Sequence, residues 1–158
     1  MHPKKYALIG GILMLVMGLL ALVPSLYENY AANVNLPPLA LNTSYGLFLG
    51  IFPMNILNKI ALIIFGIAGI AAANAPTTNL PKSILWSRAV FVIMGAAAIL
   101  GAIPQTSTLN GYWPLFNAEV WTHGLFALLG AYFGFALTTA ASRENDRKGP
   151  VKNAPLGI

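Results

Sequence analysis

Cysteine is absent from the 158-residue chain, and charged residues make up only 8% of it. Without cysteine the sequence offers no disulfide, no thiolate metal site and no cysteine nucleophile. An average soluble domain is about one quarter charged, so a chain with this few charges could not cover the surface of a soluble domain. Only four acidic residues and two histidines are present, which leaves few groups for acid–base chemistry.

Hydrophobic residues make up 57% of the sequence and gather in four long runs. The runs cover residues 6–23, 55–73, 84–103 and 120–140. Each is close to the ~20 helical residues that cross a bilayer core. The predicted fold class is therefore all-α, an integral membrane four-helix transmembrane bundle. Residues 1–142 are expected to form a single four-span transmembrane domain, and residues 143–158 a charged cytoplasmic tail.

The first run could be mistaken for a signal peptide. Its apolar core is longer than the usual stretch of about 7–15 residues, and no A-x-A cleavage site follows it. We expect a retained helix.

Basic residues flank the runs in a pattern that predicts topology. Lys4 and Lys5 precede the first run, Lys82 and Arg88 bracket the start of the third, and four basic residues follow the last. The first and third connections contain no lysine or arginine. By the positive-inside rule, both termini are cytoplasmic, and the expected location is a bacterial inner or thylakoid membrane. The basic residues form no stripe with interleaved aromatic residues, so nucleic acid is not an expected partner.

The first outer connection, residues 24–54, is broken by prolines and rich in tyrosine and phenylalanine. Such rings suit the headgroup interface, so we expect a lid over the outer ends of the helices. A short interfacial helix near residues 45–51 is predicted within this lid, with a re-entrant hairpin as the alternative. The second outer connection, before the last run, has the same composition.

Small residues recur at helical spacing on one face of each run. Close backbone packing along such faces holds helices together in lipid. The glycines expected to pack in this way are Gly11, Gly18, Gly66, Gly69, Gly95, Gly130 and Gly134. The opposite face of the last run carries Trp121, Leu125, Leu128, Tyr132 and Phe135. We expect this partner face to contact lipid or a larger protein.

A polar cluster is predicted at the outer helix ends, made of Asn55, Asn58, Lys59, Glu119 and His123. Glu119 and His123 are four residues apart, and therefore one turn apart on the same helix face. Ionisable residues at membrane depth favour a functional site. The structural alternative makes Asn55 and Glu119 helix caps, bonds His123 to a backbone carbonyl and extends Lys59 to the headgroups. A lysine near a helix N-terminus opposes the macrodipole, so Glu119 is expected to be its countercharge.

No metal site is expected, because one histidine and one carboxylate fall short of the roughly three or four protein ligands that zinc requires. A single histidine can serve as an axial ligand. The prediction is therefore no cofactor, with haem, chlorophyll or a carotenoid at His123 as the alternative. The sequence shows no nucleophile–base pair and no glycine-rich phosphate loop, which indicates a protein that is not an enzyme.

Three stretches resemble a known family: ALIGGILMLVMGLLALVPSL, YGLFLGIFPMNILNKIALIIFGIAGIAAA and PLFNAEVWTHGLFALLGAYFGF. They are similar to small bacterial four-helix membrane proteins known as domain of unknown function 4383, common in cyanobacteria and actinobacteria. The resemblance implies the same four-span bundle and brings no established activity. It also implies histidines at the positions of Asn58 and Leu62, whereas the acidic-x-x-x-His pattern is kept as Glu119 and His123.

If the family's histidines jointly bind a metal or cofactor, this chain has lost most of that site. The leading hypothesis is a non-enzymatic accessory or stabilising subunit of a larger photosynthetic or respiratory membrane complex. Its expected partners are the lipid bilayer and other membrane protein subunits. The alternatives are a haem- or pigment-binding module that uses His123, and a small transporter or stress-response membrane protein.

Overall fold

The computed structural model describes residues 2–29 and 36–137, which form four α-helices and a small sheet. The α-helices are α1 (Pro3–Leu20), α2 (Ile56–Asn74), α3 (Asn79–Ala102) and α4 (Ala118–Ala131). A π-helical stretch, η3 (Tyr132–Ala136), continues α4. The connection between α1 and α2 contains a 3-10 turn, η1 (Pro24–Leu26), and the strands β1 (Tyr27–Asn29), β2 (Gly46–Phe48) and β3 (Phe52–Met54).

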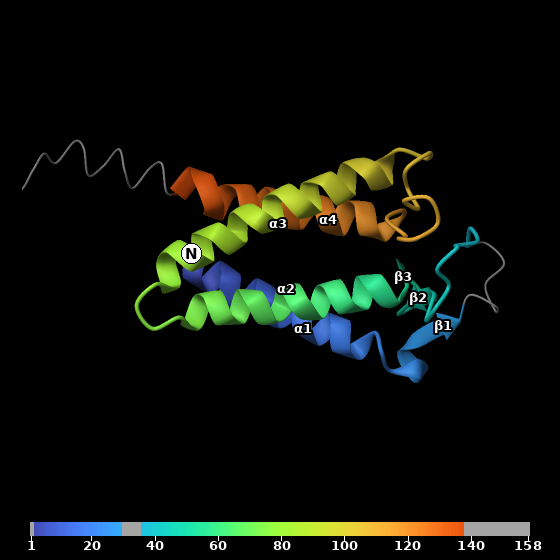
Figure 1. The fold of residues 1–158 in the computed structure, drawn as a ribbon, viewed down its shortest axis with the longest axis horizontal. Coiled ribbons are helices and arrows are strands. Elements are labelled where there is room, and N and C mark those ends of the chain that lie inside the picture. Colours follow the sequence, from blue (N-terminus) through green and yellow to red (C-terminus); the bar gives the residue numbers. More distant parts are fainter. Residues whose placement is uncertain (1, 30–35, 138–158) are drawn as a thin grey trace, which may run out of the picture.

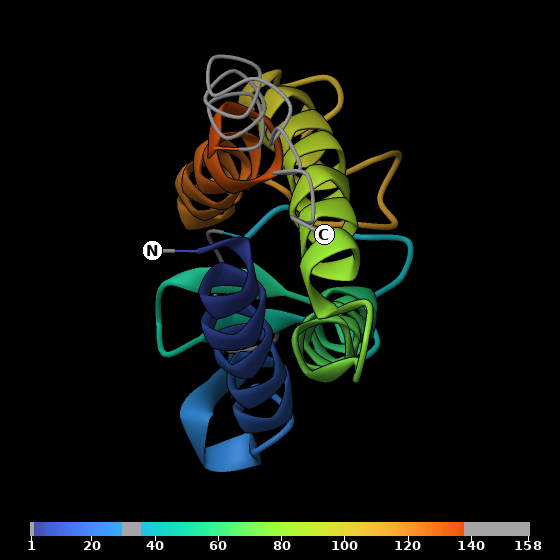
Figure 2. The ribbon, with the colours of Figure 1, turned by 90° about the vertical axis from the view of Figure 1, so that its left-hand side faces the viewer.

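The helices are arranged as two antiparallel pairs, with α1 along α2 and α3 along α4 (Figure 1). The two long connections lie at the same end of the molecule, here called the loop end, and the short α2–α3 turn lies at the opposite end (Figure 1). The view along the helices shows one pair stacked on the other (Figure 2). Because the pairs are antiparallel, the first residues of α2 and α4 meet at the loop end.

Three helices, α1, α2 and α3, are long and apolar enough to cross a membrane. The mostly helical fold predicted from the sequence is therefore confirmed. α3 begins at Asn79, before the predicted start at residue 84, because proline at position 81 is tolerated in the first turn of a helix. α4 has 14 residues, and η3 extends it to Ala136. The remainder of the predicted fourth span, as well as the charged tail, lies outside the described residues.

The connection between α1 and α2 corrects the all-α prediction. β1 pairs with β2 and β2 with β3, both antiparallel, so that Tyr27, Phe48 and Phe52 lie side by side across the sheet. The helix expected near residues 45–51 is wrong. Leu49 and Gly50 have positive φ angles of 54° and 69°, as in the tight turns that join hairpin strands.

Backbone contact through glycine holds each helix pair together. A Cβ atom on Gly11 would lie 2.8 Å from the Gly66 carbonyl oxygen, and one on Gly66 would lie 2.5 Å from the Leu15 nitrogen. Between α3 and α4, a Cβ on Gly130 would lie 2.7 Å from a carbonyl oxygen of α3. Gly18, Gly69 and Gly134 approach their neighbours as closely. Gly95 does not, since its Cβ would have only an ordinary 3.7 Å contact.

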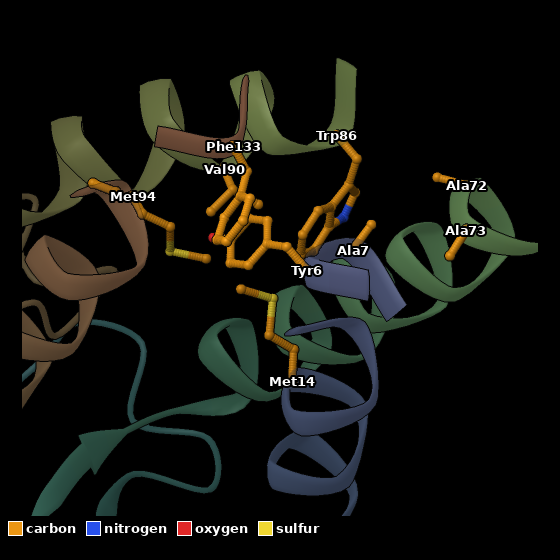
Figure 3. Close-up of a cluster of buried hydrophobic side chains, with 10 residues drawn as sticks. Tyr6, Ala7, Met14, Ala72, Ala73, Trp86, Val90, Met94 and Phe133 are labelled. Carbon is orange, nitrogen blue, oxygen red and sulfur yellow. The ribbon is translucent and has the colours of Figure 1, made fainter. Parts of the chain in front are cut away.

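A cluster of buried apolar side chains joins the two pairs (Figure 3). The Tyr6 ring stacks on Phe133 with centroids 4.7 Å apart, and it lies 5.5 Å from the Trp86 ring. The polar groups of Tyr6 and Trp86 also make hydrogen bonds from one helix pair to the other. The Tyr6 hydroxyl donates to the Phe126 carbonyl at 3.1 Å, and Trp86 Nε1 donates to the Phe65 carbonyl at 3.1 Å. Buried Tyr and Trp side chains need such partners, and here the partners fix how the pairs stack.

Gly66→Ala is expected to lower the free energy of unfolding by about 1–3 kcal/mol, as overpacking does, because its Cβ would meet the Leu15 backbone. Gly124→Ala is the matched control, since a Cβ there meets nothing within 4 Å. Alanine also favours a helix over glycine by roughly 1 kcal/mol, so the control is expected to be at least as stable as the wild type. Thermal unfolding of the purified variants in one detergent measures both effects. Equal midpoints for the two variants would contradict the close approach of α1 and α2.

Candidate functional site

Asn55 begins α2 as its N-cap. Its side-chain oxygen accepts from the backbone N–H groups of Leu57 at 3.0 Å and Asn58 at 3.4 Å. The Asn58 side-chain oxygen accepts in return from the Asn55 backbone N–H at 3.2 Å. The two side chains thus form a capping box that satisfies backbone N–H groups left open at a helix start.

The same two asparagines tie both long connections to α2. Asn55 Nδ2 donates to the carbonyl oxygens of Leu41 at 3.2 Å and Tyr112 at 2.7 Å. Asn58 Nδ2 donates to the Pro114 carbonyl at 3.3 Å. We call these three hydrogen bonds the asparagine clasp. All the polar atoms of both side chains are engaged, so Asn55 and Asn58 serve structure at the loop end.

Lys59 is only 1% exposed and is held under the small sheet. Its Nζ donates to the Ser44 hydroxyl at 2.7 Å and lies 4.2 Å from the centre of the Tyr27 ring, a cation–π contact. Burial raises the pKa of the Tyr27 phenol, and its hydrogen bond with Ser44 acts in the opposite direction. Lys59 forms no ion pair with Glu119, whose Oε2 lies near His123 instead. The expected countercharge role of Glu119 is therefore wrong.

Glu119 and His123 form a second group, in the first two turns of α4. Their side chains are 6% and 13% exposed, and Glu119 Oε2 lies 3.5 Å from His123 Nε2. This is longer than the about 2.7–3.2 Å of an ordinary N–H···O hydrogen bond. Glu119 Oε1 and His123 Nδ1 have no hydrogen-bond partner among the described residues. A buried polar atom without a partner costs about 1–3 kcal/mol, so this pair opposes folding.

Two partly open cavities lie against the Glu119–His123 pair. The larger has a volume of about 80 Å³ and is lined by α2, α3, α4 and, from the second long connection, Trp113 and Leu115. The smaller, of about 30 Å³, lies toward α1 and β3. Leu62 and Met94 line both cavities together with the pair. The remaining lining is apolar apart from Asn58 in the larger cavity and Thr122 in the smaller.

The five residues of the predicted polar cluster therefore divide into two groups with different surroundings. Asn55, Asn58 and Lys59 hold the loops, whereas Glu119 and His123 face the cavities. No local pattern in the sequence marks Ser44 as the partner of Lys59. Nor does any such pattern indicate the carbonyl acceptors of the clasp, since any residue type has a carbonyl. No three histidine, cysteine, aspartate or glutamate side chains gather at one place in the described part of the chain.

The outward side of α4 carries the predicted partner face. The exposed fraction is 81% for Trp121 and 72% for Leu128, the two largest values among the exposed large apolar side chains of the described residues. Leu125, Tyr132 and Phe135 are exposed as well. The face is continuous along the helix and lies away from the cavities, so it is separate from the Glu119–His123 pair.

Fold and site together define a small helical bundle with a buried acid–histidine pair beside a partly open cavity. The sequence profile of a family described as "Domain of unknown function (DUF4383)" matches residues 4–136. The chain belongs to this family, which confirms the resemblance drawn from its three motifs. Comparisons with curated proteins and with solved structures give no match.

Two substitutions at Asn55 are expected to distinguish its contribution as a helix cap from its contribution to the asparagine clasp. Asn55→Ser keeps an oxygen for the cap but loses the amide donors to Leu41 and Tyr112, whereas Asn55→Ala loses both functions. We expect Asn55→Ala to be less stable than Asn55→Ser by about 0.5–2 kcal/mol, the usual value of a cap. Limited proteolysis of residues 36–54 should accelerate in both variants, because the clasp is lost in both. Asn42→Ala, at an exposed position, is the control, and unchanged proteolysis at Asn55→Ala would refute the clasp.

Proposed function

We propose that the chain is a four-span integral membrane protein that binds a small hydrogen-bonding molecule at the Glu119–His123 pair, without catalysing a reaction. One observation carries this proposal: two buried polar atoms of the pair have no partner in the described residues, and Glu119 and His123 line both cavities. Ionisable side chains within a span are costly and are typically retained for function. A role for Glu119 as a helix cap has less support, because its Oε2 faces His123 and its Oε1 has no partner within the described part of the chain.

The proposed placement in the membrane follows from the helices and the charge pattern. α1, α2 and α3 have the required length, and α4 with η3 provides the fourth span. The positive-inside rule then places both termini and the α2–α3 turn in the cytoplasm of a bacterial inner or thylakoid membrane. The loop end faces outward. Glu119 and His123 accordingly lie inside the bundle just below the outer surface, covered by the two long connections.

The cavity volumes favour a small group over a haem or a chlorophyll-type pigment at His123. The larger cavity measures about 80 Å³. An engineered protein cavity that admits a single benzene ring measures about 150 Å³. A macrocycle would have to displace α2 or α3, whose positions are fixed by Trp86 and by the asparagine clasp.

Native mass spectrometry of the protein gently extracted from its source membranes tests this function. We expect the wild type to carry a bound molecule that is released on collisional activation. The double variant Glu119→Leu, His123→Leu should lack it, since both hydrogen-bonding groups are removed. Ser83→Ala, a buried position away from the cavities, is the control and should retain it. A wild-type protein with no bound molecule, or a double variant with undiminished binding, would overturn the proposal.

A second candidate function is that of an accessory or stabilising subunit of a photosynthetic or respiratory membrane complex. The outward face of α4 favours it, because Trp121 and Leu128 are the most exposed large apolar side chains in the described part of the chain. We propose a transmembrane helix of another membrane subunit as the occupant of this face. Aromatic residues are enriched at protein interfaces, and close packing against a helix would cover the whole stripe.

The double variant Leu128→Ser, Tyr132→Ser is expected to release the chain from such a complex while the bundle stays folded, because both side chains point away from the core. Native electrophoresis of source membranes, with the chain followed by mass spectrometry, measures the release. Ile99→Ser, an equally exposed position on α3, is the matched control and should remain in the complex. Migration of the wild type as a monomer or small oligomer would refute this second function.

A further inference from the structure

We infer that the molecule held at the Glu119–His123 pair is a lipid-soluble alcohol, with a hydroxyl head at the pair and a single long apolar chain that leaves the bundle between α3 and the second long connection. This inference rests on the proposed function and names the ligand class and its route. Three features of the described residues carry it: an apolar groove that adjoins the cavity, the hydrogen-bonding character of the open atoms, and the size of the cavity.

The groove provides the route. It has a volume of about 300 Å³ and is open to the outside of the molecule. It is lined by Val92, Ile93, Ala96, Ala97 and Leu100 of α3, and by Leu109, Trp113 and Leu115 of the second long connection. Every one of these side chains is apolar except for the indole nitrogen of Trp113. Such a groove suits a hydrocarbon chain far better than a polar solute.

The groove and the larger cavity share a wall. Ile93, Ala97, Trp113 and Leu115 line both spaces, so only these side chains separate the groove from the Glu119–His123 pair. Ala97 is the smallest of them. The proposed route for the end group of a chain lying in the groove therefore passes over Ala97 into the cavity.

The open atoms select the head group. Glu119 Oε2 lies 3.5 Å from His123 Nε2, and a neutral imidazole has one nitrogen that donates a hydrogen bond and one that accepts. Glu119 Oε1 accepts when the carboxyl is ionised and can donate when it is protonated. A hydroxyl group both donates and accepts, so it bonds to the pair in either protonation state of Glu119. An ether or an ester has no donor, so it can bond neither to an ionised carboxylate oxygen nor to the accepting nitrogen of the imidazole.

The charge and the size of the head group restrict the class of ligand further. A carboxylate or phosphate head would carry a charge into these largely apolar cavities, and neither cavity is lined by a lysine or arginine that could pair with that charge. Lys59 is committed to Ser44 and Tyr27. A ring-bearing head such as a quinol exceeds the cavity of about 80 Å³, whereas the hydroxyl end of a linear chain fits.

Photolabelling of the full-length protein in phosphatidylcholine vesicles tests the inference. The probe is hexadecan-1-ol with a diazirine in mid-chain, and its methyl ether is the matched control that cannot donate a hydrogen bond. We expect the alcohol to label residues 92–100 and 109–115 about tenfold more than the ether, the effect of one lost hydrogen bond. His123→Leu should reduce labelling by the alcohol to the level of the ether.

Ala97→Phe provides a test that leaves the pair intact, since it fills the passage between the groove and the cavity. It should abolish the difference between alcohol and ether even if His123→Leu fails to fold. Equal labelling by the two probes in the wild type would overturn the inference, as would a difference that survives Ala97→Phe. If native mass spectrometry then shows another bound molecule, the proposed function stands and only the ligand class is wrong. If it shows none, both are overturned.

Discussion

Every polar atom of a buried asparagine needs a partner, and at Asn55 this requirement organises the whole loop end. The N–H groups at the start of α2 lie under the two long connections, away from water, where open donors are costly. The side-chain oxygen of Asn55 accepts from two of them, and its side-chain nitrogen donates to the carbonyl groups of Leu41 and Tyr112. The connections, which lack long helices, thereby gain fixed positions. The wall of the larger cavity depends on this, because Trp113 follows Tyr112 directly.

The spacing of the helices explains why a cavity exists at the loop end. α1 and α2 touch through backbone along their length, from Gly69 near one end to Gly18 near the other. α3 and α4 touch equally closely at Gly130, but at Gly95, nearer the loop end, a Cβ would be 3.7 Å from its neighbour. Contact between α3 and α4 is therefore less close at Gly95 than at Gly130. Glu119 and His123 border the two cavities on the loop-end side of Gly130.

Local patterns made most of the helices predictable, whereas contacts between distant segments were beyond sequence reasoning. The apolar runs and the cap at Asn55 fixed α2 closely, since length, hydrophobicity and a capping side chain are properties of neighbouring residues. The strands pair residues across a long connection, and no alternating pattern marks Gly46–Phe48. Lys59 was placed correctly at the start of α2, but its partner was not, because Ser44 acquires its position only through the sheet.

The separation of the asparagines from the acid–histidine pair limits the chemistry that the cavity can support. The family resemblance implies histidines where this chain has Asn58 and Leu62, and both positions line the larger cavity beside Glu119 and His123. In this chain the Asn58 side-chain oxygen accepts a hydrogen bond in the cap of α2, and its nitrogen donates to the Pro114 carbonyl. Leu62 is apolar. The polar groups left to a ligand are therefore the two open atoms of one pair. Two such atoms suffice to orient a hydroxyl group, which both donates and accepts a hydrogen bond.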